Sequence, residues 1–338
     1  MHPVLALNRY FWALLRIIQT IFLFLPLAIL PGFARSQDPG HVQGRDTMVL
    51  HSGLRDTPPP AGRKWIVGGT QAVIWAGTFI GLNKAWYADY PRSDFHFFND
   101  WGEWQQMDKV GHAWTSYHLS RLSGDAWKWA GLGDRKAAIV GGITGVAYMS
   151  AIEILDGFSS EWGFSTGDML MNITGASLYT VQELTWHRQT FQIKFSYWPN
   201  AYPADLKPRA EELFGNTPME RVLKDYNSQT YWLNVNLHDL FPSSRIPGWF
   251  CVSLGYGARV MLGARENKWT EADGTVVDRT DIQRYRRFFL SADVDLTRIH
   301  TRNKLLKTVF SIVNLVKIPA PAIEINTSGG FKLHALYY

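Results

Sequence analysis

Residues 250–262 read Phe-Cys-Val-Ser-Leu-Gly-Tyr-Gly-Ala-Arg-Val-Met-Leu, with an apolar side chain at every second position. Because successive side chains of a strand point to opposite faces of a sheet, this alternation predicts a strand with one apolar and one polar face. Five further segments show the same period of two, at 191–197, 231–238, 290–297, 323–326 and 331–337. Turn residues such as Asp273-Gly274 separate the segments. Residues 188–338 are therefore predicted to form an antiparallel β domain.

Six amphipathic strands are compatible with two arrangements. In the first, the polar faces line an interior and the apolar faces meet lipid, as in an outer-membrane barrel, and the terminal Tyr337-Tyr338 suits an aromatic girdle. In the second, the sheet lays its apolar face against the helical part of the chain. Single-chain bacterial barrels have at least about eight strands, so the sequence favours the second arrangement and leaves the first open.

Residues 64–187 are predicted to form a helical domain. The uncharged stretch Trp65–Asn83 is about long enough to span a bilayer. The stretch Ala137–Ile152 is shorter, and its glycines at 141, 142 and 145 permit close helix packing. A third helix is expected over Thr166–Thr185, with Ser165 as its N-cap. Membrane helices and a buried globular bundle both fit these patterns, and the predicted fold class is α+β.

The first 36 residues have the pattern of a signal peptide. Arg9 and Arg16 supply positive charge, an apolar run covers 17–30, and Ala34-Arg35-Ser36 fits the small-x-small rule for cleavage. An uncleaved anchor helix is the alternative. No Cys follows the leader at this point, so lipid attachment is not expected. Residues 37–63 are polar and proline-rich, which predicts an extended linker.

The composition excludes several classes of protein. Hydrophobic residues make up 46% of the 338 residues, so the chain is not intrinsically disordered. The single Cys251 excludes an internal disulfide and a multi-thiolate metal site. Removal of the leader, which holds three Arg and no acidic residue, lowers the net charge from +5 to +2. The chain has no basic cluster interleaved with aromatic residues, so nucleic acid is not an expected partner. A membrane is an expected partner because of the apolar helices and the amphipathic strands.

Five polar residues form the candidate site. Asp108 and His112 are four residues apart and so share a helix face, and Asp168 and Asn172 do the same early in the next predicted polar helix. Glu153 ends an apolar helix. Ionisable groups in apolar helices usually face partners or a cavity, so these side chains could converge. A buried hydrogen-bond network, a cation site and an acid–base pair all remain open, and the sequence names neither a metal nor a cofactor.

Two motifs around these residues carry a resemblance. Asp-Lys-x-Gly-His at 108–112 is followed by Ser-Ser-Glu-Trp-Gly-Phe-Ser-x-Gly-Asp-x-x-x-Asn-x-x-Gly at 159–175. Over residues 95–185 the chain resembles the YfiM-like family of predicted bacterial periplasmic lipoproteins, a family of unknown function. The same motifs are similar, more distantly, to VanZ-like membrane proteins, which would imply membrane helices. Neither resemblance implies a catalytic residue.

The sequence thus predicts a bacterial cell-envelope protein, in the periplasm or outer membrane, with the inner membrane as the alternative. A non-enzymatic role in envelope structure, assembly or transport is favoured because the chain has no P-loop and no complete catalytic motif. Gly163-Phe-Ser165-Thr-Gly167 places a serine between glycines, but Ser165 is interpreted as a helix N-cap and not as a nucleophile. Protein partners in the envelope fit this role. The alternatives are an enzyme that acts on lipid or cell-wall precursors, with His112 as general base, and a metal-binding module at the same residues.

Overall fold

A computed structural model describes residues 62–83 and 91–338. The predicted signal peptide, 1–36, and nearly all of the predicted linker, 37–63, lie outside the described residues. The last two residues of that linker, Gly62 and Arg63, already belong to the first described helix.

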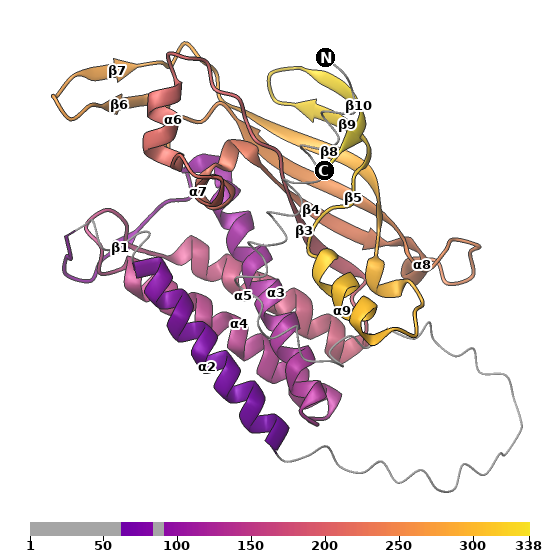
Figure 1. The fold of residues 1–338 in the computed structure, drawn as a ribbon. Coiled ribbons are helices and arrows are strands. Elements are labelled where there is room, and N and C mark those ends of the chain that lie inside the picture. The colour runs from indigo at the N-terminus through magenta and orange to yellow at the C-terminus, as the bar shows by residue number, and fades with distance from the viewer. Residues whose placement is uncertain (1–61, 84–90) are drawn as a thin grey trace, which may run out of the picture.

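Long helices make up the described part of the N-terminal half, as Figure 1 shows. They are α2 (Gly62–Leu82), α3 (Met107–Trp129), α4 (Asp134–Asp156) and α5 (Thr166–Thr185). The predicted bounds of α5 are confirmed, and its N-cap Ser165 accepts a hydrogen bond from Asp168 N at 3.0 Å. The two-residue strand β1 (Phe97–Phe98), which precedes α3, pairs in parallel with β2 (Phe164–Ser165), which lies between α4 and α5.

Glycines allow α4 and α5 to lie close against α3. A Cβ atom at Gly141 would stand 2.4 Å from Ser120 O, and one at Gly175 would stand 2.1 Å from Ala113 O. Both distances are too short for any side chain, so the backbones meet directly there. The prediction that glycines in the second apolar stretch permit close packing is confirmed.

Among the residues that the structure describes, two helices, α2 and α4, are long and apolar enough to cross a membrane, judged by length and composition alone. Of the 18 consecutive residues with the highest hydropathy in each helix, 6% are buried in α2 and 39% are buried in α4. The helix α2 is held to the bundle by Val67, which packs against Ala126 and Ala130, and by a hydrogen bond from Gln71 Nε2 to Ser123 Oγ at 2.7 Å.

The six predicted strands form one antiparallel sheet in the order β10-β9-β8-β5-β4-β3. Their bounds are β3 (Phe191–Tyr197), β4 (Gln229–Asn236), β5 (Phe250–Arg259), β8 (Tyr285–Val294), β9 (Ala320–Asn326) and β10 (Phe331–Tyr337). Within the described ranges the sheet is open and does not close into a barrel. The α+β fold class is therefore confirmed, and the barrel arrangement is not what these strands form.

Short elements that the sequence pattern did not predict lie between the strands. They are the hairpin of β6 (Lys268–Thr270) and β7 (Val276–Asp278) and the helices α6 (Lys207–Phe214), α7 (Pro218–Lys224) and α8 (Leu237–Leu240). The helix α9 (Lys304–Val313) connects β8 to β9, and its N-cap Asn303 accepts a hydrogen bond from Leu306 N. Gly274, at a φ of +87°, makes the turn of the hairpin where Asp273-Gly274 indicated one.

The sheet meets the helical half through only part of its apolar face. Phe195 of β3 and Tyr231 of β4 are buried in a cluster with Met107 at the start of α3. Trp114 of α3 packs on both, with ring centroids at 5.5 Å and 6.5 Å. The predicted contact between the apolar face and the helices therefore exists at β3 and β4, while farther along the sheet the same face is exposed.

Candidate functional site

The helices α3 and α5 bring the candidate residues together from two directions. Asp108 and His112 lie one turn apart at the start of α3, and Asp168 and Asn172 lie one turn apart at the start of α5. The Ser165 cap fixes the first turn of α5, which places Asp168 at the positive end of the helix dipole. Glu153 enters from the last turn of α4. All five predicted residues converge.

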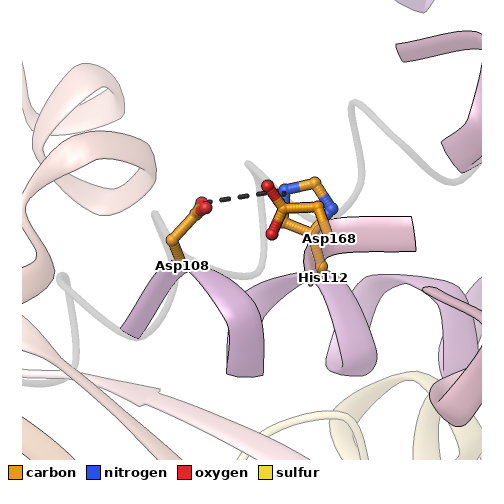
Figure 2. A group of neighbouring side chains, drawn as sticks. All are labelled: Asp108, His112 and Asp168. Atoms are coloured by element: carbon orange, nitrogen blue, oxygen red, sulfur yellow. Dashed lines mark ion pairs between the residues drawn. The ribbon is translucent and has the colours of Figure 1, made fainter. Parts of the chain in front are cut away.

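The imidazole of His112 is the centre of the cluster (Figure 2). Its Nε2 lies 3.7 Å from Asp108 Oδ1 and 3.8 Å from Asp168 Oδ1. Its Nδ1 lies 3.1 Å from Asn172 Oδ1 and 3.3 Å from Glu153 Oε1. Because Nδ1 faces two acceptors, a neutral ring carries its proton there. The lone pair of Nε2 then points toward two carboxylates, an arrangement that calls for a proton or a metal cation between them.

A lysine next to the predicted residues completes the network. Lys109 Nζ lies 2.6 Å from Asp100 Oδ2, 2.7 Å from Asp168 Oδ1 and 3.3 Å from Asp108 Oδ2. Its side chain is 3% exposed. Lys109 belongs to the first quoted motif and Asp100 precedes that motif by eight residues. The sequence spacing did not indicate that the lysine side chain turns inward.

The β half also contributes one group to the site. Tyr226, in the segment before β4, donates a hydrogen bond from its hydroxyl to Asp108 Oδ1 at 2.8 Å. This tyrosine is 118 residues from its acceptor. No local pattern could reveal this contact, because it depends on how the sheet docks on α3.

The cluster holds more carboxyl groups than basic groups. Four carboxyl groups face one ammonium and one imidazole, and Glu153, Asp168 and Asn172 are buried while Asp108 and His112 are partly exposed. Asn172 Nδ2 is buried without a hydrogen-bond partner among the described residues. The site is thus closed on the side of α4 and α5 and open to solvent beside the start of α3.

Burial and charge shift the pKa values of the central groups in opposite directions. Burial alone would lower the pKa of His112, but the carboxylates of Asp108, Asp168 and Glu153 outweigh it and raise the pKa to about 9. Burial, followed by the negative charge of Asp108, raises the pKa of Asp168 to about 7. For Asp108, the positive charges of His112 and Lys109 overcome the cost of burial, so its pKa is lowered. The site therefore tends to hold a cation or a proton at neutral pH.

The glycines of the two motifs have packing reasons. A Cβ atom at Gly111 would lie 2.9 Å from the hydroxyl of Tyr231, where β4 meets α3. A Cβ atom at Gly167 would lie 3.1 Å from Lys109 Cε. The motifs therefore encode both the charged cluster and the close backbone contacts that hold it.

The donor set fits a divalent metal ion. One ligand atom from each of Asp108, His112 and Asp168 lies within 4.8 Å of the other two. Tetrahedral zinc with bonds of about 2.1 Å separates its ligands by about 3.4 Å, so side-chain rotations would close the remaining gap. Glu153 and Asn172 stand behind His112 as the partners that orient a metal-bound imidazole. Mixed imidazole and carboxylate ligands suit zinc and manganese.

Comparison with known proteins covers this part of the chain. Residues 94–183 match the family described as Predicted periplasmic lipoprotein (DUF2279), and that range contains all five candidate residues. Neither a curated protein nor a solved structure matches the chain. The YfiM-like and VanZ-like similarities stay predictions. The helical half of this chain is thus similar to a family of predicted periplasmic lipoproteins, which supports a location in the cell envelope.

Proposed function

We propose that this envelope protein binds a divalent metal ion in its helical half, between Asp108, His112 and Asp168. The observation that carries the proposal is the orientation of the His112 ring, whose Nε2 faces two carboxylates while Nδ1 faces Glu153 and Asn172. A carboxylate behind a histidine that faces other ligands is typical of metal centres. The role is taken to be non-enzymatic, in envelope structure, assembly or transport, with the ion stabilising the junction of α3, α4 and α5.

A competing interpretation is that the network only stabilises the fold. Lys109 already neutralises part of the charge on Asp168, which supports that interpretation. However, the single ammonium of Lys109 is shared among three carboxyl groups, those of Asp100, Asp108 and Asp168. A carboxylate that contacts both an ammonium and a metal ion is compatible with the geometry at Asp168.

An acid–base enzyme is the second candidate, and one observation favours it. Asp168, whose pKa is raised to about 7 by burial and by Asp108, lies 3.8 Å from His112 Nε2 and could gain or lose a proton near neutral pH. The partly exposed side chains of Asp108 and His112 give a substrate access from the solvent side. Such an enzyme would act on lipid or cell-wall precursors of the envelope.

Metal binding separates these interpretations. The purified full chain is stripped with a chelator and titrated with Zn²⁺ and Mn²⁺ by calorimetry. We expect about one ion per chain. The variant Glu153→Gln leaves the ligands in place but removes the carboxylate behind His112, and should weaken affinity about 10-fold to 100-fold.

The control is His300→Gln, which removes an exposed histidine outside the cluster and should leave affinity unchanged. Wild-type protein that binds neither ion stoichiometrically would contradict the proposal and leave the structural network or the acid–base site. Equal affinity of Asp168→Asn and wild type would place any bound ion elsewhere.

A further inference from the structure

The part of the apolar sheet face that the helices do not cover is exposed to solvent. One row of aliphatic side chains crosses five strands as direct neighbours in the register: Leu233, Leu254, Leu290, Ile323 and Leu333. Their exposed fractions lie between 39% and 71%. Soluble monomers seldom leave so continuous an apolar surface in water.

A second row lies beside the first. Phe288, Ile325 and Phe331 are register neighbours on β8, β9 and β10 and are 42%, 54% and 62% exposed. These three side chains and the aliphatic row contain no charged or polar group, and we call the eight residues together the outer face. The helical half covers this side of the sheet at β3 and β4, and the turn before α3 also contacts Tyr256 of β5 and Arg286 of β8.

The opposite face of the same strands buries charges. Lys194 Nζ lies 3.2 Å from Asp293 Oδ2, and both side chains are 0% exposed. Arg287 donates two hydrogen bonds to the Glu324 carboxylate, at 2.8 Å and 2.7 Å. Tyr337 at the end of β10 reaches back across this face, where its ring stacks on Phe289.

This distribution is the reverse of that in a soluble antiparallel sheet. Such a sheet turns its apolar face to the core and its polar face to water. Lipid-facing sheets turn polar side chains inward and apolar ones outward. Here the inward charges form ion pairs, which offset the desolvation cost of burying them. The outer face, in contrast, is apolar and therefore suited to an apolar environment.

A basic amphipathic helix lies at one end of the sheet. Figure 1 shows α9 near the end of the sheet where β8 ends and β9 begins. No acidic residue occurs between Asp295 and Glu324, while α9 presents Lys304 and Lys307 together with the exposed Leu305. A helix with basic and apolar faces is suited to the surface of an anionic membrane.

The strand lengths indicate how deep such a contact can be. The strands β9 and β10 have seven residues each. At about 3.3 Å per residue they are about 23 Å long, and at a tilt of about 45° they reach about 16 Å deep. This is roughly half of the hydrocarbon core, which is about 30 Å thick.

We propose that the outer face inserts into one leaflet of a membrane that contains anionic lipid, with α9 at the level of the headgroups. A second copy of the chain could cover the outer face, but it would place another basic helix near α9 instead of a negative charge. Anionic lipid supplies acyl chains for the apolar outer face and negatively charged headgroups for the basic α9. The inference is independent of metal binding, because no residue of the outer face belongs to the site.

Lipid contact is tested residue by residue with a fluorescent probe on the full chain. In a Cys251→Ser background, Leu254→Cys and Leu333→Cys place the probe on the outer face. Val276→Cys is the control, because Val276 is 59% exposed on the β6–β7 hairpin, outside the outer face. The vesicles contain phosphatidylcholine with about one-third phosphatidylglycerol and a nitroxide-labelled lipid as quencher.

We expect the lipid quencher to reduce probe emission several-fold at both outer-face positions and little at the hairpin. Equal quenching at all three positions would overturn the proposal. Probes that become shielded as protein concentration rises, without lipid quenching, would overturn it in favour of a second copy. Circular dichroism verifies that the three variants share the wild-type fold.

The role of α9 is tested separately. The double variant Lys304→Gln with Lys307→Gln should weaken binding to the anionic vesicles about fivefold for each lysine removed. Binding to vesicles of phosphatidylcholine alone should not change. If the double variant binds anionic vesicles as tightly as the wild type, the assignment of α9 to the headgroup level is wrong.

Discussion

Replacement of Lys109 by Met tests whether the charged cluster depends on one buried ammonium. The Lys109 side chain is 3% exposed and its Nζ lies 2.7 Å from Asp168 Oδ1. With an effective dielectric constant of about 20, Coulomb's law gives roughly 6 kcal/mol for a pair at this distance. The desolvation of both groups offsets part of this attraction. Removal of one partner from a buried pair typically costs about 3–5 kcal/mol, and we expect Lys109→Met to lower the free energy of unfolding by that amount.

The assay is urea unfolding of metal-free protein, followed by tryptophan fluorescence. Lys207→Met is the matched control, because Lys207 pairs with Glu211 at 3.7 Å while their side chains are 64% and 41% exposed. An exposed pair contributes about 0–1 kcal/mol. If Lys109→Met falls within about 1 kcal/mol of this control, the inward ammonium does not stabilise the cluster as argued.

Saturating Zn²⁺ should act on Lys109→Met in a second way. A divalent ion can replace the missing positive charge between the carboxylates. At a concentration of about 100 times the dissociation constant, it would restore about 2.7 kcal/mol. A variant that stays equally unstable with and without the ion would argue against a shared metal and lysine site.

Two further predictions concern packing and acid stability. Gly141→Ala places a Cβ atom 2.4 Å from Ser120 O and should cost about 1–3 kcal/mol or more, whereas Gly77→Ala meets open space on α2 and should stabilise that helix by up to about 1 kcal/mol; equal melting temperatures would refute this packing argument. Burial would raise the pKa of Glu324, but Arg287 lowers it to about 2. The folded pKa is depressed, so stability should be lost as pH falls from about 4.5 toward 2, and Glu324→Gln should lose less over that range. Thermal unfolding at several pH values measures this, and identical acid profiles would count against it.

The sequence predicted the strands well because alternation is a local property. All six segments with a period of two are strands of one sheet, and Thr166–Thr185 is a helix with the predicted cap. Alternation shows that a strand has two unlike faces, but it does not say which face turns inward. Lys194 and Asp293 belong to the polar face of the strands, and they form an ion pair whose side chains are both 0% exposed.

The candidate site was predictable in the parts that depend on helix geometry. The spacing of four placed Asp108 beside His112 and Asp168 beside Asn172. The inward turn of Lys109 and the approach of Tyr226 depend on tertiary packing, and no local spacing encodes them. Short elements such as the β6–β7 hairpin escaped notice because three residues are too few to show a period.

The most direct test of metal binding is the crystal structure of protein grown with Zn²⁺, with diffraction data collected at the zinc absorption edge. We predict one anomalous peak within about 2.0–2.2 Å of Asp108 Oδ1, His112 Nε2 and an Asp168 carboxylate oxygen. A structure without a peak there, in which Lys109 remains the only cation between the carboxylates, would contradict the proposed metal site.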